Sequence, residues 1–362
     1  MCIFQRILGG YLGMTLSFKG RLSLLCAVIV FVLFLQVPAG MGREIVDMSG
    51  NRHTLPDKVT RVYSASPPGT YLLYAVKPES IVGLNFPLWQ NEKLYTTKQY
   101  QQLPVIGGMV GQGRTVNREV LLQAKPDCIL VWCWKQGAAN KKFENSLRSL
   151  GVPLVSVHLE SIYDYPQAIT FLADLLDEQQ RGEKLTRYAQ EALKQAEQIV
   201  RELTPAEKIR VYYAEGLDGL STEASNSFHV ELIPLAGGVN VHQGEAASEY
   251  GMEKISMEKL MLYDPDCILV KDQRFFKQVW SDPKWQVLRA VQNKRVYLIP
   301  HDPFNWFDRP PSFMRLLGIK WMLSILHPQK FPLDMVAETQ TFYKMFLGVD
   351  ITVEQAKEIL EL

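Results

Sequence analysis

Apolar residues between Pro166 and Leu203 recur with the period of an α-helix. In the second part of this stretch they follow one another at steps of three and one, which places them on a single face at 3.6 residues per turn. The positions that form this face are Leu185, Tyr188, Ala189, Ala192, Leu193, Ala196, Ile199, Val200 and Leu203. The pattern predicts one straight amphipathic helix in the middle of the chain.

The limits of this helical stretch can be read from capping and breaking residues. A shorter amphipathic run comes first, with Asp164 as its N-cap and Pro166 in its first turn. We expect Gly182 to separate this run from the long helix and Pro205 to end the pair. From Glu183 to Leu203 the long helix would span roughly 30 Å, about the diameter of a small domain.

The same sequence block occurs on both sides of the helical stretch. Residues 116–131 read VNREVLLQAKPDCILV, and residues 255–270 read ISMEKLMLYDPDCILV. Each copy follows a Gly-Gly pair, and each half of the chain begins with Arg-Val-Tyr, at Arg61 and again at Arg210. The spacing is too long for a solenoid repeat. It therefore predicts two similar lobes joined by one long helix.

Short apolar runs in each half alternate with helical segments, which predicts an α/β fold class. A β-hairpin is expected at 43–55, further strands at 61–65, 81–84, 128–132, 209–214, 237–241, 267–270 and 296–299, and helices at 70–75, 228–235 and 312–326. We accordingly divide the chain into a signal peptide at 1–39, an N-terminal lobe at 40–165, connecting helices at 166–204 and a C-terminal lobe at 205–362.

Composition agrees with a globular protein of about two domains. The chain has 362 residues, of which 47% are hydrophobic and 21% charged, with a formal net charge of +1. This balance indicates neither a nucleic acid nor an acidic surface as partner.

The N-terminus carries the pattern of an export signal. Lys19 and Arg21 precede an apolar run at 22–37, and the small residues of 38–42 follow. A membrane anchor is the alternative interpretation, but a mostly apolar run of 16 residues is short for a membrane span. We expect residues 1–39 to be removed and the mature protein to be periplasmic.

Cysteine usage does not favour a lipid anchor or a disulfide framework. Cys26 follows two leucines and lacks the small residue of a lipoprotein cleavage site, and Met14 is an alternative start that would give the signal an ordinary length. Cys128, Cys133 and Cys267 remain after cleavage, an odd number. Cys128 and Cys267 occupy matching positions of the repeat, where buried inert thiols are expected.

Candidate ligand contacts lie on loops that follow the predicted strands, because parallel α/β sheets bind ligands at the carboxyl ends of their strands. Aromatic rings and arginines there suit a planar, anionic ligand. The alternatives are that Trp89 covers the core and that Asp308 and Arg309 form a local ion pair. The predicted ligand-binding residues are Trp89, Trp134, Tyr250, Arg274, Trp306 and Arg309.

Catalytic and cofactor motifs give little support to an enzyme. The stretch GMVGQGRT at 108–115 has the spacing of a phosphate-binding loop, but Arg114 stands where that motif has lysine. No zinc-protease, nucleophile-elbow or paired C-x-x-C motif occurs in the sequence. Direct metal ligation would need scattered histidines to converge. The four candidates are His158, His229, His242 and His301.

Taken together, these motifs resemble one family, the solute-binding proteins of ATP-driven importers for iron-siderophores, haem and cobalamin. The stretches that carry the resemblance read RVYSASPPG, VNREVLLQAKPDCILVW and FDRPPSFMRLLGIKW, together with the long helix between the lobes. The resemblance implies two Rossmann-like lobes bridged by a rigid helix, with the ligand held in a cleft between them. It covers nearly the whole chain after the signal.

The resemblance also implies partners. Family members dock onto the arginines of an ABC permease dimer, which works with ATPase subunits, through one acidic residue on each lobe. Those residues match Glu119 and Glu258, the glutamate shared by the two copies of the repeat. Many family members are lipid-anchored at an N-terminal cysteine, and this sequence differs from them.

The expected ligand is an iron-chelate-type molecule, namely a siderophore, haem or a corrinoid. Iron or cobalt would belong to the ligand. We expect the protein itself to have no cofactor and no catalytic residue. The alternatives are direct binding of a transition metal or an oxyanion, or an exported enzyme with two lobes.

Overall fold

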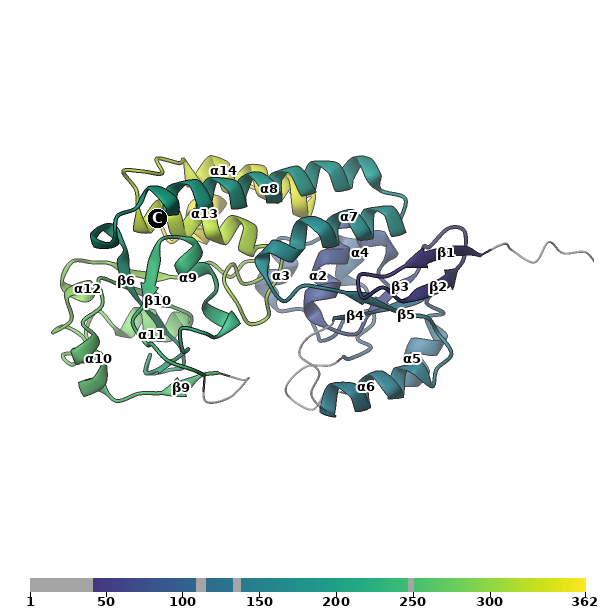
Figure 1. Cartoon of the computed structure of the whole chain (residues 1–362), viewed down its shortest axis with the longest axis horizontal. Coiled ribbons are helices and arrows are strands. Elements are labelled where there is room, and N and C mark those ends of the chain that lie inside the picture. Colours follow the sequence, from purple (N-terminus) through teal and green to yellow (C-terminus); the bar gives the residue numbers. More distant parts are fainter. Residues whose placement is uncertain (1–41, 109–114, 133–137, 247–250) are drawn as a thin grey trace, which may run out of the picture. The chain divides into compact units, whose positions relative to one another are not determined.

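The computed structural model describes residues 42–108, 115–132, 138–246 and 251–362. The chain divides into two compact units, Met1–Arg43 and Glu44–Leu362, and both parallel sheets belong to the second unit (Figure 1). The expected signal peptide lies outside the described residues, as do Cys133, Trp134, Tyr250 and most of the 108–115 loop. Within the described ranges, none of the helices has the length and apolar character that a membrane span requires.

The first sheet contains three parallel strands in the order β3-β4-β5. These are β3 (Val62–Ser64), β4 (Cys128–Trp132) and β5 (Leu154–Val157). Residues on both faces of these strands are buried, as is usual for parallel sheets covered by helices on each side. Strands β3 and β4 were expected from the apolar runs, whereas β5 was not.

The second sheet contains four parallel strands in the order β11-β10-β6-β8. They are β6 (Ile209–Ala214), β8 (Gly238–Asn240), β10 (Cys267–Val270) and β11 (Val296–Leu298). Both copies of the Cys-Ile-Leu-Val string form strands that pair with the first strand of their sheet, β4 with β3 and β10 with β6. Cys128 and Cys267 are buried, and burial raises the pKa of Cys267 to about 12. The prediction of two similar lobes is confirmed.

The expected hairpin is formed by β1 (Arg43–Val46) and β2 (Arg52–Leu55). Its turn is organised by the buried Asp47, whose carboxylate accepts hydrogen bonds from the Asn51 and Ser156 backbone N–H groups at 2.8 and 3.1 Å. Although burial alone would raise the pKa of Asp47, these bonds and that of His53 hold it at about 2. The charged carboxylate thereby ties the hairpin to β5.

Helices surround the two sheets, and most of them are short. In the first half they are α2 (Pro67–Val76), α3 (Gln90–Leu94), α4 (Lys98–Gln101), α5 (Arg118–Gln123) and α6 (Ala138–Arg148). In the second half they are α9 (Leu232–Leu235), α10 (Met257–Tyr263), α11 (Gln273–Gln278), α12 (Arg289–Gln292), α13 (Arg315–Leu326), α14 (Met335–Phe342) and α15 (Val353–Ile359). A π-helical turn follows α14 at Tyr343–Leu347. Two short strands, β7 (Ser221–Thr222) and β9 (Glu253–Lys254), form a separate antiparallel pair.

The helical stretch between the lobes forms α7 (Tyr165–Leu175) and α8 (Gln179–Glu202). The expected break at Gly182 is wrong, because α8 begins at Gln179 and runs through this glycine. A side chain at Gly182 would collide with the Cβ of Ala173 on α7. The glycine therefore allows the two helices to pack closely rather than separating them.

The long helix α8 packs against both halves of the chain. It contacts α7, which follows the first sheet, and α13, which follows the second (Figure 1). Its predicted apolar face is buried from Leu185 to Ala196. The helix therefore joins the two lobes through packed side chains, as expected of a rigid connection.

The C-terminal helices return to the first lobe. The Tyr74 hydroxyl of α2 donates to the Leu347 carbonyl at 3.1 Å, and the rings of Tyr95 and Tyr343 meet edge to face. The lobe boundaries drawn from the sequence stay a prediction, and these contacts show that residues beyond 335 also cover α2.

Candidate ligand-binding site

Charged side chains converge where three strands of the second sheet end. Glu215 directly follows β6, Lys271 directly follows β10, and Arg309 lies on the loop after β11. Carboxyl ends of parallel strands meet at one edge of a sheet, which explains why these residues approach one another. Arg309 Nε and Lys271 Nζ both donate to Glu215 Oε1, at 2.9 and 3.2 Å.

Arg309 also pairs with two more carboxylates, those of Glu223 and Asp308. Its guanidinium donates to Glu223, which follows β7, and its Nε lies 3.3 Å from the Asp308 carboxylate. Glu223 in turn accepts hydrogen bonds from the Met252 backbone N–H and the Ser227 hydroxyl, both at 2.8 Å. Arg309 is partly buried and the three carboxylates are fully or almost fully buried. We call Glu215, Glu223, Lys271, Asp308 and Arg309 the strand-end cluster.

Burial and neighbouring charges set the protonation of this cluster. Burial raises the pKa of Glu215 to about 7, against the opposing effect of Arg309 and Lys271. Asp308 is buried as well, but its hydrogen bond with His229 keeps its pKa below the ordinary value. The carboxylates around Arg309 raise its pKa in spite of its burial. Glu215 can therefore exchange a proton near neutral pH.

Two buried atoms of this neighbourhood have no hydrogen-bond partner within the described part of the chain, Glu215 Oε2 and His229 Nε2. The other ring nitrogen of His229, Nδ1, lies 2.6 Å from Asp308 Oδ2. A buried carboxylate oxygen without a donor disfavours the charged form, in agreement with the raised pKa of Glu215.

A second polar group lies at the end of β3 and the start of α2 in the first lobe. The Thr70 hydroxyl donates to Asn85 Oδ1 at 2.7 Å, and Asn85 Nδ2 donates to the Ser64 carbonyl at 2.9 Å. The hydroxyl of Ser66 is buried and has no partner among the described residues. This group contains neutral hydrogen-bonding side chains, in contrast to the charged cluster of the second lobe.

The loop after β11 reaches the first lobe. The Phe304 ring stacks on Tyr71 of α2 with ring centres 3.9 Å apart, and Asn91 Nδ2 donates to Asp302 Oδ1 at 2.7 Å. The loop that carries Arg309 is thus held from both lobes. Its position is set by packing, which suits a site that must keep its geometry.

The prediction that Trp306 contacts the ligand is wrong. Its side chain has 0% exposed surface, and its indole N–H donates to the Asp302 carbonyl at 3.1 Å. A side chain at Gly318 of α13 would collide with the Trp306 backbone, so that helix packs directly on this residue. Trp306 belongs to the core and offers no surface to a ligand.

The remaining predicted contacts fall in different places. Trp89 is 71% exposed at the start of α3, so it does not cover the core, and its role in binding stays a prediction. Arg274 is exposed on α11 and pairs with Asp272. Of the four predicted contacts that the structure describes, Arg309 is the one that lies in the strand-end cluster. The ion pair with Asp308, which was the alternative to a ligand contact, is formed, and ligand binding by Arg309 stays a prediction.

Sequence reasoning did not select Glu215, Glu223 or Lys271. A signal for two of them was present, because Glu215 and Lys271 are the first residues after predicted strands. Glu223 lies eight positions beyond Glu215, past a turn and the two-residue strand β7, and no pattern marked it.

The histidines considered as metal ligands do not converge. His229 meets Asp308, His242 meets Glu253 at 2.9 Å, and His158 lies 3.6 Å from Glu160. His301 lies 3.9 Å from Asp302. In the described ranges no group of three or more histidine, cysteine or carboxylate side chains is arranged to hold a metal ion.

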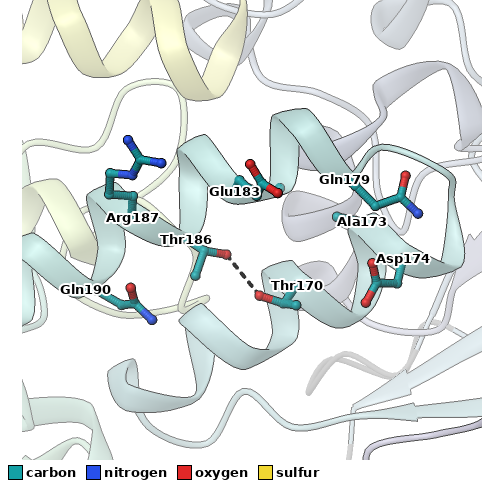
Figure 2. Close-up of a pocket in the computed structure, with 9 residues that line it drawn as sticks. Thr170, Ala173, Asp174, Gln179, Glu183, Thr186, Arg187 and Gln190 are labelled. Atoms are coloured by element: carbon teal, nitrogen blue, oxygen red, sulfur yellow. Dashed lines mark hydrogen bonds between the residues drawn. The ribbon is translucent and has the colours of Figure 1, made fainter.

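A surface groove of about 360 Å³ lies between α7 and α8 (Figure 2). The hydroxyls of Thr170 and Thr186 meet across it at 3.1 Å. Its walls are helix side chains and include none of the strand-end cluster. The groove follows from the close approach of the two helices at Gly182, and we assign no ligand to it.

Comparison with known proteins identifies the family. The sequence profile of the periplasmic binding proteins matches residues 73–303, more than half of the chain. The chain belongs to the periplasmic binding protein family. Members of this family bind solutes for ABC transporters and work with a permease and ATPase components; they are transport proteins rather than enzymes.

Individual relatives cover most of this family member. A molybdate-binding protein of Haemophilus influenzae is 25% identical over 333 residues, covering 84% of this chain and 90% of that protein. A vitamin B12-binding protein of Vibrio cholerae is 25% identical over 261 residues, covering 70% and 85%. The solved structure of an ABC transporter solute-binding protein from Sulfurospirillum deleyianum has 36% identity and a TM-score of 0.82, covering 88% of this chain and 99% of that one.

The two glutamates expected to dock on the permease occupy equivalent places in the repeat. Glu119 and Glu258 are exposed second residues of α5 and α10. Each helix is capped by the side chain at its N-cap, since Asn117 accepts from the Val120 N–H and Ser256 accepts from the Lys259 N–H. The repeat thus presents one carboxylate per lobe on the same kind of helix start.

Proposed function

We propose that this protein is the ligand-binding subunit of an ABC importer that captures a metal chelate, namely a siderophore, haem or a corrinoid. The observation that carries this proposal is the strand-end cluster, which holds Arg309 and Lys271 where three parallel strands end. Relatives named as vitamin B12-binding proteins support a chelate of this size. Trp89 is exposed enough to stack on a planar ligand.

The charges of the cluster suggest how an anionic ligand would be held. Arg309 and Lys271 both pair with Glu215. A ligand carboxylate, hydroxamate or phosphate would compete with Glu215 for these donors, and Glu215 can give way by taking up a proton because its pKa is about 7. The site would then exchange one internal carboxylate for the anionic group of the ligand.

Ligand capture can be tested on the exported protein. We would purify it from its native host, identify co-purifying molecules by native mass spectrometry, and titrate the stripped protein with ferric siderophores, haemin and cyanocobalamin. Intrinsic fluorescence should change, and Lys271→Ala should weaken binding at least tenfold. Equal affinity of Lys271→Ala and the unaltered protein would place the site elsewhere. Turnover of the chelate would favour an enzyme, whereas stoichiometric retention supports a binding protein.

An oxyanion is the second candidate. The relative named as a molybdate-binding protein aligns with 84% of this chain, a larger share than the vitamin B12-binding relatives cover. Small oxyanions are bound by hydrogen-bond donors such as hydroxyls and arginines. Calorimetric titration with molybdate and tungstate alongside the chelates decides between the two classes, because a site selective for one will not retain the other.

Delivery to the permease is proposed to use Glu119 and Glu258. Helix stabilisation alone would explain one glutamate in a first turn, but two at matched positions suit a contact with two permease subunits. The double variant Glu119→Ala with Glu258→Ala should abolish uptake while leaving ligand binding and melting temperature unchanged. Normal uptake by this variant would refute the docking role.

A further inference from the structure

The His229 ring is held in one orientation beside the strand-end cluster. It lies on a short 3₁₀ turn, Phe228–Val230, where the His229 N–H donates to the Ser227 hydroxyl at 3.3 Å. That hydroxyl in turn donates to Glu223 at 2.8 Å. On the other side, His229 Nδ1 lies 2.6 Å from Asp308 Oδ2. The side chain is 5% exposed, so packing and these two bonds together fix the place of its other ring nitrogen, Nε2.

Asp308 determines which nitrogen of the His229 ring carries the proton. Although burial alone would raise it, the hydrogen bond with His229 and the charges of His229 and Arg309 hold the pKa of Asp308 below its ordinary value. The carboxylate is therefore charged at neutral pH, and Nδ1 donates its proton to it. Nε2 of the neutral ring is then a hydrogen-bond acceptor. This nitrogen is buried and meets no partner in the part of the chain that the structure describes.

The unmet hydrogen bonds of this region require donors. Glu215 Oε2 is likewise buried without a partner in the described ranges, and it is an acceptor when the carboxylate is charged. Arg309 Nε and Lys271 Nζ already donate to the other oxygen of Glu215. A buried acceptor without a donor is costly, whereas a paired one is not. A ligand that brings N–H groups removes this cost, and a ligand that brings only oxygen acceptors does not.

The charge of the strand-end cluster favours an uncharged donor. Its three carboxylates pair with the two cations Lys271 and Arg309, so the cluster has no surplus of positive charge. Protonation of Glu215 can balance one anionic group of the ligand, but a second one at His229 would find no cation. A cationic group at His229 would lie close to the Arg309 guanidinium, because Asp308 contacts both residues. The N–H of a carboxamide is a donor without charge and avoids both repulsions.

We infer that His229 is a ligand-binding residue whose Nε2 accepts a hydrogen bond from a carboxamide N–H of the ligand. This inference rests on the proposed function, in which Arg309 and Lys271 hold an anionic group of the same ligand. The ligand class is a metal chelate that carries amides, either the carboxamide side chains of a corrinoid or the backbone amides of a siderophore. Haem and molybdate have no N–H group to donate, so they leave Nε2 without a partner.

Two variants at His229 separate the roles of its ring nitrogens. His229→Asn keeps an amide that can donate to Asp308, but it has no atom in the place of Nε2. It should weaken binding of an amide-bearing chelate by roughly tenfold. His229→Gln is longer and returns an amide oxygen close to that place, so it should recover part of the loss.

His327→Asn is the matched control. His327 is buried as well, but its Nε2 lies 3.4 Å from the carbonyl of Gly237, which directly precedes β8. It therefore belongs to the edge of the parallel sheet opposite to the strand-end cluster. His327→Asn should bind every ligand as the unaltered protein does. Melting temperature and circular dichroism establish that each variant is folded.

Matched ligands test the same contact in the unaltered protein. Calorimetric titration of the stripped mature protein compares cyanocobalamin with its monocarboxylic acids, in each of which a carboxylate replaces one carboxamide. Ferric aerobactin represents amide-bearing siderophores, and haemin and molybdate are the ligands without N–H groups. If a corrinoid supplies the amide, one of the monocarboxylic acids should bind roughly tenfold more weakly than cyanocobalamin. If a siderophore supplies it, ferric aerobactin should bind and cyanocobalamin should not.

The outcomes separate this inference from the proposed function. Weaker binding of an amide-bearing chelate by His229→Asn, with partial recovery in His229→Gln and none of the loss in His327→Asn, supports the inference. Equal affinity of His229→Asn and the unaltered protein for that chelate overturns it and leaves the proposed function standing, because Nε2 then meets only water. If His229→Asn does not fold, equal affinity of the unaltered protein for cyanocobalamin and all its monocarboxylic acids overturns it in the same way.

Three further results would also count against the inference. A change in the visible absorption of the bound chelate that His229→Asn abolishes would show that Nε2 ligates the metal, which overturns the amide contact. Binding of haemin without either amide-bearing chelate overturns the inference within the proposed function, whereas binding of molybdate alone overturns both. An equal loss in His327→Asn would show that the effect is not specific to His229.

Discussion

The Nε of Arg309 donates to the Glu215 carboxylate at 2.9 Å and so connects the loop after β11 to the end of β6. The same guanidinium also forms ion pairs with Glu223 and Asp308. Buried carboxylates that share one cation depend strongly on it, because removing the cation leaves uncompensated charge in a medium of low polarity.

Arg309→Met should therefore lower the free energy of unfolding by about 3–5 kcal/mol at pH 7.5. The loss should shrink towards pH 5, where Glu215 is protonated and needs no counterion, because its pKa is about 7. Urea denaturation at both pH values measures the effect. Arg274→Met, at an exposed arginine of α11, is the control and should change stability by less than about 0.5 kcal/mol. Similar losses for both variants would contradict the assignment.

Glu92 offers a test of pH-dependent stability. It is buried, and burial together with the nearby Asp302 raises its pKa from 4.5 to about 7, although the Trp89 N–H bonds to its carboxylate. Between these two values the folded protein binds more protons than the unfolded chain, so this group makes stability fall as pH rises from about 4.5 to 7.

Glu92→Gln keeps an acceptor for the Trp89 N–H and removes the buried charge. At pH 8 the variant should be more stable than the unaltered protein by up to about 3 kcal/mol, and at pH 4 the two should be equal. Thermal unfolding followed across this pH range measures the difference. A constant offset at all pH values would show that the effect comes from packing and not from titration.

The close approach of α7 and α8 can be tested with a pair of substitutions. Gly182→Ala places a methyl group against Ala173 and should destabilise the protein by about 1–3 kcal/mol. Adding Ala173→Gly removes the opposing methyl group and should recover most of this loss, apart from about 1 kcal/mol for glycine in a helix. Chemical denaturation of both single variants and the double variant gives the coupling energy, and additive effects would exclude the proposed contact.

Ligand binding should be accompanied by proton uptake. An anionic group placed against Arg309 and Lys271 raises the pKa of Glu215 further above 7, so affinity should increase as pH falls and decrease as pH rises. Calorimetry at pH 7.5 in buffers of different ionisation enthalpy measures the protons taken up with each ligand of the proposed series. Glu215→Gln should abolish the uptake, and uptake that survives in this variant would assign it to another group.

The sequence predicted those parts of the fold that are specified locally. The Pro-Asp-Cys-Ile-Leu-Val strings are continuous apolar runs behind a turn, and both form central strands of parallel sheets. The long helix followed from its apolar period. The helix break predicted at Gly182 was wrong because a glycine inside a helix can mark either a break or a close contact with another helix. Only the position of Ala173 distinguishes the two.

The site was less accessible to sequence reasoning because it depends on how loops fold back. Trp306 and Arg309 lie three residues apart on one loop, yet the first is fully buried and the second reaches the strand-end cluster. Exposure along an irregular loop follows no period. The carboxylates that surround Arg309 come from segments almost 100 positions apart, which a local pattern does not connect.

The return of the C-terminal residues to α2 has a consequence for how the protein acquires its structure. Tyr74 and Leu347, which are joined by a hydrogen bond, are 273 positions apart. Contacts between such distant segments form late and slow the folding of a chain. Because synthesis proceeds from the N-terminus, the first lobe is begun early but its outer side is covered only when the last helices emerge. The first lobe is therefore completed only after the C-terminal residues have been synthesised. A chain that ends before Leu347 would leave the aromatic side of α2 open to water.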